Sequence, residues 1–257
     1  MSGKYERKKE KKQKMGFLKR PWAALILALL VLAVSVALAM RRTDAVPEPG
    51  KIQQTEGAEI NATAGVPEGK TSFILNDALQ ITKLGSYTGA YMEDGSDEIL
   101  SGVAMIIAEN TGDQTLQYAE ITLSGSVGDA LFKLSTLKPG EKAVVLEANR
   151  KAYHAQDVYT EAAASNVVYF TEPVSLMEDQ FEIQPLDGGF NITNISGEDI
   201  TGRITVYFKD FADGMYYGGI TYRGHIDGGL KKDEVRQIMS ANFSASGTAV
   251  VFVTVTQ

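Results

Sequence analysis

The residues that could perform chemistry are few, and their spacing matches no known catalytic or metal-binding pattern. The chain has two histidines, His154 and His225, and no cysteine. It contains no zinc-binding histidine pair, no phosphate-binding glycine loop and no Gly-x-Ser-x-Gly motif. A histidine without a suitably spaced partner is usually a surface or turn residue. We therefore predict that the chain is not an enzyme and has no catalytic residue, no metal site and no bound cofactor.

Carboxylates form two short clusters that could offer oxygen ligands to calcium. The first consists of Glu93, Asp94, Asp97 and Glu98, and the second of Asp210 and Asp213. Neither cluster has the spacing of an EF-hand loop, and Asp-Gly pairs are common in tight turns. We interpret both clusters as turns between strands.

The most distinctive string for binding runs from residue 215 to residue 223. It combines aromatic, thioether and guanidinium side chains around Gly218-Gly219: Met215, Tyr216, Tyr217, Tyr222 and Arg223. Tyrosine and arginine are enriched at the centres of protein interfaces, which makes this string a candidate partner-binding surface. In the alternative interpretation, the tyrosines fill a core and the two glycines form a β-bulge.

Short runs of β-forming residues dominate the chain after residue 70. Examples are residues 102–108, 121–123, 143–146, 190–194, 204–208 and 249–256, separated by turn residues such as Pro139-Gly140. Alternation of apolar and polar residues in several of these runs is typical of half-buried strands. We expect Val251 and Val253 to share one face of the last strand. Strands at this spacing predict a mainly β chain organised as a β-sandwich.

Four sequence matches, in the same order, divide this region into two related units. Residues 73–81 match 175–183, residues 109–116 match 193–200, residues 137–141 match 230–234, and residues 166–170 match 249–253. Asn110 aligns with Asn194, and Glu141 aligns with Glu234. We define the first unit as residues 71–172 and the second unit as residues 173–257.

The turn at an asparagine and the string Leu137-Lys-Pro-Gly-Glu141 before a strand resemble the small bacterial Ig-like modules of the FxLYD and CARDB kind. The resemblance covers both units. It implies two tandem Ig-like β-sandwich domains that act as extracytoplasmic binding or spacer modules, without catalytic residues.

The N-terminal part of the chain has the pattern of a membrane anchor. An uncharged apolar run extends from Trp22 through Leu30 to Met40, and a helix of 19 residues spans about 30 Å, the thickness of the bilayer hydrocarbon. We assign residues 1–20 to a basic cytoplasmic tail, residues 21–40 to a transmembrane helix in contact with membrane lipid, and residues 41–70 to a flexible linker. The alternative is a cleaved signal peptide, for which Ala37-Leu-Ala39 is a suitable cleavage site.

Charge predicts the orientation and excludes one class of partner. The first twenty residues contain nine basic and two acidic side chains, whereas the whole chain has a net charge of −7. The basic flank favours a cytoplasmic N-terminus and an extracytoplasmic body at the plasma membrane. The acidic body does not suit nucleic-acid binding. The absence of cysteine favours the surface of a Gram-positive bacterium.

These observations predict a single-pass cell-surface protein that binds a protein or another cell-envelope partner, or assembles with it. The alternatives are a structural or accessory subunit of a pilus or secretion apparatus, and a carbohydrate-active accessory protein.

Overall fold

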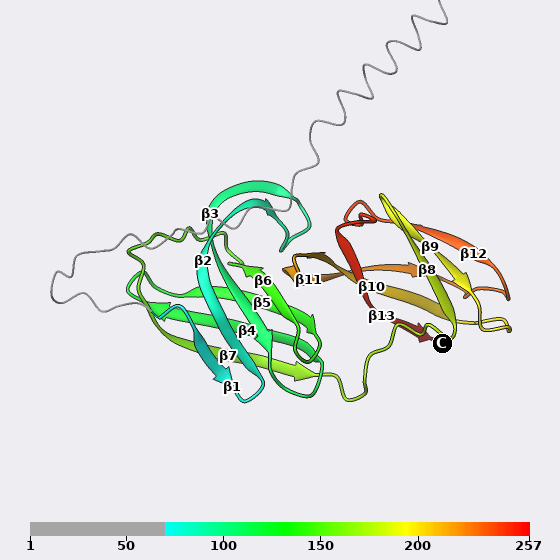
Figure 1. Cartoon of the computed structure of the whole chain (residues 1–257), viewed down its shortest axis with the longest axis horizontal. Helices are drawn as coiled ribbons and strands as arrows, with labels where there is room; N and C mark the ends of the chain where they lie inside the picture. The colour runs from blue at the N-terminus through cyan, green and yellow to red at the C-terminus, as the bar shows by residue number, and fades with distance from the viewer. Residues whose placement is uncertain (1–69) are drawn as a thin grey trace, which may run out of the picture. The chain divides into compact units, whose positions relative to one another are not determined.

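The computed structural model describes residues 70–257, and the regular secondary structure in that range consists entirely of β-strands (Figure 1). The predicted tail, transmembrane helix and linker lie outside these residues, apart from Lys70. The strands are β1 (Phe73–Asn76), β2 (Leu79–Tyr91), β3 (Glu98–Asn110), β4 (Leu116–Gly125), β5 (Ala130–Leu137), β6 (Lys142–Leu146), β7 (Tyr159–Tyr169), β8 (Phe181–Leu186), β9 (Gly189–Asn194), β10 (Arg203–Ala212), β11 (Met215–Ile226), β12 (Val235–Met239) and β13 (Thr248–Thr256). The prediction of a mainly β chain is confirmed.

The two units repeat one arrangement of strands. In the first unit, strands in the order β2-β3-β6 pack on a sheet ordered β5-β4-β7. In the second unit, β8-β9-β12 pack on β11-β10-β13. Each strand of the second unit therefore takes the place of the strand six positions earlier in the first. β1 is an addition to the first unit and pairs with the edge of β2.

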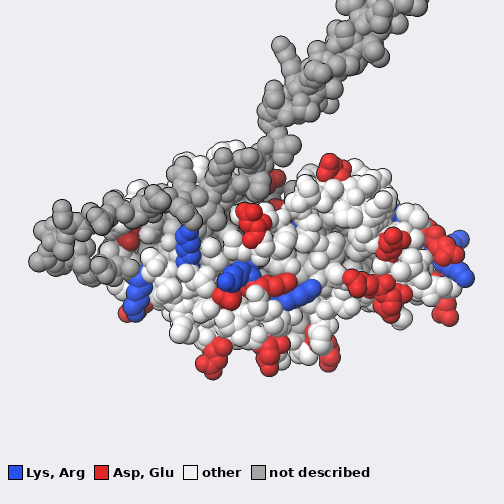
Figure 2. Space-filling view, viewed as in Figure 1, with Lys and Arg blue, Asp and Glu red and all other residues white. Residues whose placement is uncertain are grey.

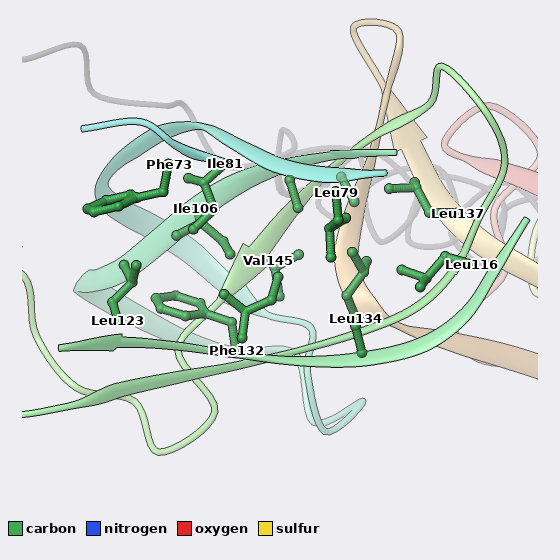
Figure 3. Packing of buried hydrophobic residues seen from close by; sticks show 14 of the residues in the cluster. Phe73, Leu79, Ile81, Ile106, Leu116, Leu123, Phe132, Leu134, Leu137 and Val145 are labelled. Atoms are coloured by element: carbon green, nitrogen blue, oxygen red, sulfur yellow. The ribbon is translucent and has the colours of Figure 1, made fainter. Parts of the chain in front are cut away.

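Alternating burial explains how the sheets of the first unit pack. In β4, Ile121 and Leu123 are fully buried, and in β5 the same is true of Phe132. Leu123 and Phe132 point toward Ile81 and Ile106 on the opposite sheet (Figure 3), and Ile121 belongs to the same core. Burying each such side chain contributes about 1.5–3 kcal/mol. The core is thus built from every second residue of the strands that face it.

Asn110 and Asn194, both fully buried, make equivalent hydrogen bonds in the two units. Each side-chain Nδ2 donates to the carbonyl oxygen four residues later, at 2.9 and 2.7 Å, and to that of Leu137 or Leu230, at 2.7 and 3.1 Å. Each Oδ1 accepts the backbone N–H two residues later, at 3.0 Å in both units. One buried amide therefore joins two loops in each unit.

Glu141 and Glu234 close the same turn in the two units. Each carboxylate accepts the backbone N–H three residues earlier, at 2.7 and 2.8 Å. The residue before each glutamate has a left-handed conformation, with φ of 76° at Gly140 and 59° at Asp233. Aspartate tolerates this conformation better than most residues, so the turn persists without the Pro-Gly pair.

The units join through strands that are not equivalent. β6 of the first unit pairs in parallel with β11 of the second, with Ala143 opposite Tyr216 and Val144 opposite Tyr217. This pairing creates one seven-stranded sheet in the order β1-β2-β3-β6-β11-β10-β13. Tyr216 and Phe252, from the second unit, belong to the buried core of the first.

Two expectations about the last strand are wrong. β13 has a bulge, because Tyr207 lies opposite Phe252 whereas the next residue, Phe208, lies opposite Val250. Val251 consequently packs in the first unit's core, while Val253 packs in the second unit's core. The sequence match of residues 166–170 with 249–253 joins equivalent strands, β7 and β13, at the wrong register.

Candidate functional site

Among the described residues, those whose type and surroundings best suit them to take part in chemistry lie at the junction between the units. The parallel pairing of β6 and β11 ends after Val144 and Tyr217, where β11 bulges at Gly218, whose φ is 85°. Glu93, from the connection between β2 and β3, lies between the two strands at the point where they separate. Its Oε1 accepts the N–H of Leu146 at 2.8 Å, and its two oxygens accept the N–H of Gly219 at 3.0 and 2.8 Å.

Lys209 approaches the same glycine from β10 and is fully buried. Its Nζ donates to the carbonyl oxygens of Ser135 and Gly219, at 2.7 and 3.3 Å. The ammonium group also lies 5.8 Å from the centre of the Tyr216 ring. A lysine of the second unit is thereby bound to a strand of the first, because Ser135 belongs to β5.

Gly219 is required at this position by close contact between backbones. A Cβ atom placed on it would lie 1.8 Å from the carbonyl oxygen of Lys133 in β5. The Ser135 hydroxyl donates to the Gly219 carbonyl oxygen at 2.8 Å. Gly219 therefore receives contacts from Glu93, from Lys209 and from β5.

Burial moves the pKa values of both charged groups toward neutrality. It raises the pKa of Glu93 above its ordinary value, against the effect of the backbone N–H groups and of Lys209. It lowers the pKa of Lys209, against the effect of Glu93. The neighbouring Asp210 has its pKa raised to about 6, by burial and then by the charge of Asp97.

Shifted pKa values of this kind are frequent in active sites, and here both groups also bind backbone atoms where the units meet. The Nζ of Lys209 is enclosed by protein and binds main-chain oxygens, so it has no path to a substrate. The Glu93 carboxylate holds two strands together through their N–H groups. We assign both side chains a structural role in joining the units.

A cavity of about 310 Å³ opens beside Glu93. Tyr91 and Arg150 form part of its wall, with the guanidinium carbon 4.7 Å from the centre of the tyrosine ring. Arg150 also forms ion pairs with Asp94, at 2.7 Å, and with Glu98. Hydrogen bonds from Ser96 and Arg150 lower the pKa of Asp94 to about 2. The single guanidinium of Arg150 thus offsets part of the acidic charge at this rim.

The predicted partner-binding string lies in β11, at the junction. Tyr216 and Tyr217 are 6% and 5% exposed, and the Tyr216 hydroxyl donates to Glu141 at 3.0 Å. Tyr222 is half-buried and donates to the carbonyl oxygen of Met92 at 3.2 Å. Met215 is half-buried as well, and Arg223 is exposed. The tyrosines therefore pack as in the alternative interpretation, and partner binding here stays a prediction that now depends mainly on Arg223.

The other candidate residues remain dispersed over the described part of the chain. His154 and His225 are exposed, each within 4 Å of one aspartate, Asp157 and Asp227 respectively. Between residues 70 and 257, no three Asp, Glu or His side chains converge in a way that could hold a metal ion. No helix in this range has the length and hydropathy required to cross a membrane. Trp22, Leu30 and Met40 lie outside the described residues.

Sequence reasoning missed Glu93 and Lys209 as a pair. Glu93 belongs to an acidic cluster that the sequence predicts to form a turn. Its partners are backbone groups, which carry no sequence signal. A signal existed for Lys209, since it interrupts the apolar run of β10. A charged side chain in such a run is rarely fully buried unless it is paired.

Comparison of the chain with protein-family models, with curated protein sequences and with solved structures found no match.

Proposed function

We propose that this chain is a single-pass membrane protein that presents two tandem Ig-like β-sandwich domains outside the cytoplasm and acts by binding or assembly, without catalysis. The domains are residues 71–172 and 173–257, and the partner is a protein or another component of the cell envelope. The resemblance to FxLYD and CARDB modules supports this assignment, as does the repeated strand order of the two units.

The observation that carries the proposal is the use of Glu93 and Lys209. These two groups have the shifted pKa values expected of catalytic residues, yet both are bound to Gly219 and to neighbouring strands. The junction therefore serves to hold the units in one arrangement. A fixed pair of sandwiches suits a binding module, because a preorganised surface loses little conformational freedom on association.

Charge supports the extracytoplasmic location of the body. The basic residues precede the apolar run, and the described surface carries more acidic than basic side chains, as Figure 2 shows for one face. The apolar run contacts membrane lipid, and its basic flank remains in the cytoplasm. An acidic, cysteine-free body suits the surface of a Gram-positive bacterium.

Membrane topology provides the first test. The full chain would carry a C-terminal reporter that is active only outside the cytoplasm, and a matched chain would lack residues 22–40. We expect activity from the first chain and none from the second. Added protease should remove the body from intact wall-less cells. A body that is protected from protease would refute the location, and a body released with an N-terminus near Met40 would identify a signal peptide instead.

Partner capture tests the second part of the proposal. The full chain and its Arg223→Ala variant would be used to isolate cell-envelope proteins after crosslinking in intact cells. We expect one partner to be captured by the native chain and less of it by the variant, while both chains unfold at the same temperature. Failure to capture any envelope component reproducibly would contradict a binding function.

A further inference from the structure

β12 is an edge strand whose outer side is available for pairing. It lies at the end of the three-stranded sheet β12-β9-β8 (Figure 1). Glu234 and Ser240, which flank β12, form backbone hydrogen bonds with the β9 side of the sheet. Because hydrogen-bonding directions alternate along a strand, Val235, Gln237 and Met239 direct their N–H and C=O groups away from β9. No other group within residues 70–257 forms a backbone hydrogen bond to these three.

The first unit shows how the equivalent edge is used. β6 occupies the place in the first unit that β12 occupies in the second. The outer edge of β6 pairs with β11, a strand of the other sandwich. The corresponding edge in the second unit has no such partner within the described residues, so the fold already contains one example of this edge docking another unit.

The other edge of the same sheet is protected against pairing. Pro185 is the penultimate residue of β8, and proline has no N–H to donate. Glu182 adds a charge to that edge. β12 has only one charged residue, Arg236, which is paired with Glu234 at 2.8 Å. Edge strands are normally shielded by charge or proline, and β12 is the less shielded of these two.

We infer that the β12 edge is a self-association surface, at which a second copy of this chain adds its own β12 in an antiparallel arrangement about Gln237. Val235 and Met239 are 56% and 70% exposed, and they lie on one face of the strand with Gln237 between them. A twofold axis through Gln237 places Val235 of each copy opposite Met239 of the other. The pairing joins two three-stranded sheets into one of six strands.

Self-complementarity favours a second copy over an unrelated strand. The two exposed apolar side chains lie at equal distances in sequence from the central Gln237, so both cross-strand apolar pairs form at once. The strand is also nearly neutral on an otherwise acidic body. A five-residue strand pair buries less than the ~1,200–2,000 Å² of stable interfaces. The association is therefore weak in solution and is strengthened when both copies are confined to one membrane.

The absence of cysteine from the chain allows a direct test with single-cysteine variants. The full chain would be reconstituted in lipid vesicles as Gln237→Cys or as Gln184→Cys, the control at the opposite edge of the same sheet. Directly opposed residues in a hydrogen-bonded antiparallel pair have Cα atoms ~5.5 Å apart, a separation that a disulfide can span. Under mild oxidation we expect Gln237→Cys to form dimers at least about tenfold faster than the control, because pairing raises the local thiol concentration.

A second comparison separates strand pairing from random collision. Adding Val235→Lys and Met239→Lys to the Gln237→Cys chain places like charges opposite one another and should reduce its rate to that of the control. Ile74→Lys, on the exposed edge strand β1, should leave the rate unchanged. Equal rates for Gln237→Cys and Gln184→Cys, or crosslinking of Gln237→Cys only to another protein, would overturn the inference. The vesicle assay rests on the membrane anchoring proposed above, and rates are compared only between chains that have inserted, so that failure of the anchoring and failure of the strand pairing are distinguishable.

Discussion

Glu93 and Lys209, on different units, bind the same residue from opposite sides of its backbone. Glu93 accepts the N–H of Gly219, while Lys209 donates to the carbonyl oxygen of Gly219. The two charges thus act on each other through one residue of β11. Removing the Glu93 carboxylate leaves the fully buried ammonium group of Lys209 with less charge compensation.

Glu93→Gln tests this relationship. The glutamine side chain has one acceptor oxygen, so its amide NH2 must face a backbone N–H of Leu146 or Gly219. Lys209 also loses its nearby counter-charge. We expect a loss of about 1–3 kcal/mol in the free energy of unfolding, measured with denaturant at pH 7.5, because a backbone N–H group loses its acceptor. The control is Glu98→Gln, which removes an exposed partner of Arg150 and should change stability little. Equal effects of the two substitutions would contradict a structural role for Glu93.

Gly219→Ala tests the close contact between β11 and β5. Its Cβ would lie 1.8 Å from the Lys133 carbonyl oxygen, so one of the two strands must move. We expect a destabilisation of about 3 kcal/mol or more. Gly85→Ala is the matched control within a strand, because its Cβ would meet only the end of Met105, at 3.5 Å. A stable Gly219→Ala protein would show that the junction tolerates separation of the strands.

Asp210 makes stability depend on pH near neutrality. Its pKa in the folded protein is about 6, above the ordinary value of 3.8, so the folded state binds a proton more strongly than the unfolded state. The resulting penalty is present above pH 6 and is relieved as the pH falls from about 6 to about 4. We expect Asp210→Asn to remove this part of the pH dependence in denaturant midpoints measured from pH 4 to pH 8. The control is Asp213→Asn, an exposed carboxylate, and identical profiles for the two variants would disprove the assignment.

The shared sheet predicts that residues 70–257 unfold in one transition. Tyr216, Val251 and Phe252 belong to the second unit but are buried in the core of the first. Separating the units would expose these side chains together with Lys209. We expect calorimetry of the full chain to show one transition for this region and a fragment of residues 173–257 to be much less stable. Two well-separated transitions in the full chain would show that the junction contributes little.

Local patterns in the sequence predict much of the fold. Alternating residues locate strands such as β4 and β10, and the strings around Asn110 and Asn194 identify two turns whose hydrogen bonds agree in detail. These features succeed because each depends on residues that are close in sequence. The second unit has Asp233 where the first has Gly140, and the turn is the same because both residues can adopt a positive φ.

The candidate site was harder to predict, because it depends on contacts between distant strands. Nothing in the sequence of β6 or β11 specifies the pairing of Val144 with Tyr217, because any apolar strand could occupy that position. A single extra residue in β13 also changed the direction of Val251, and a bulge is not visible in a run of valines. Long-range register and buried backbone partners are the parts that the sequence alone does not supply.

The continuous sheet also determines how the body responds to mechanical load. β1, close to the N-terminal end of the described chain, and β13, at its C-terminal end, form opposite edges of one seven-stranded sheet. Tension applied between the two ends therefore passes across the β6–β11 ladder, where Glu93 and Lys209 add further bonds between the units. Under tension, the hydrogen bonds between β6 and β11 hold the two units together. The resistance of the junction to unfolding by force is governed by the rate at which these strands separate.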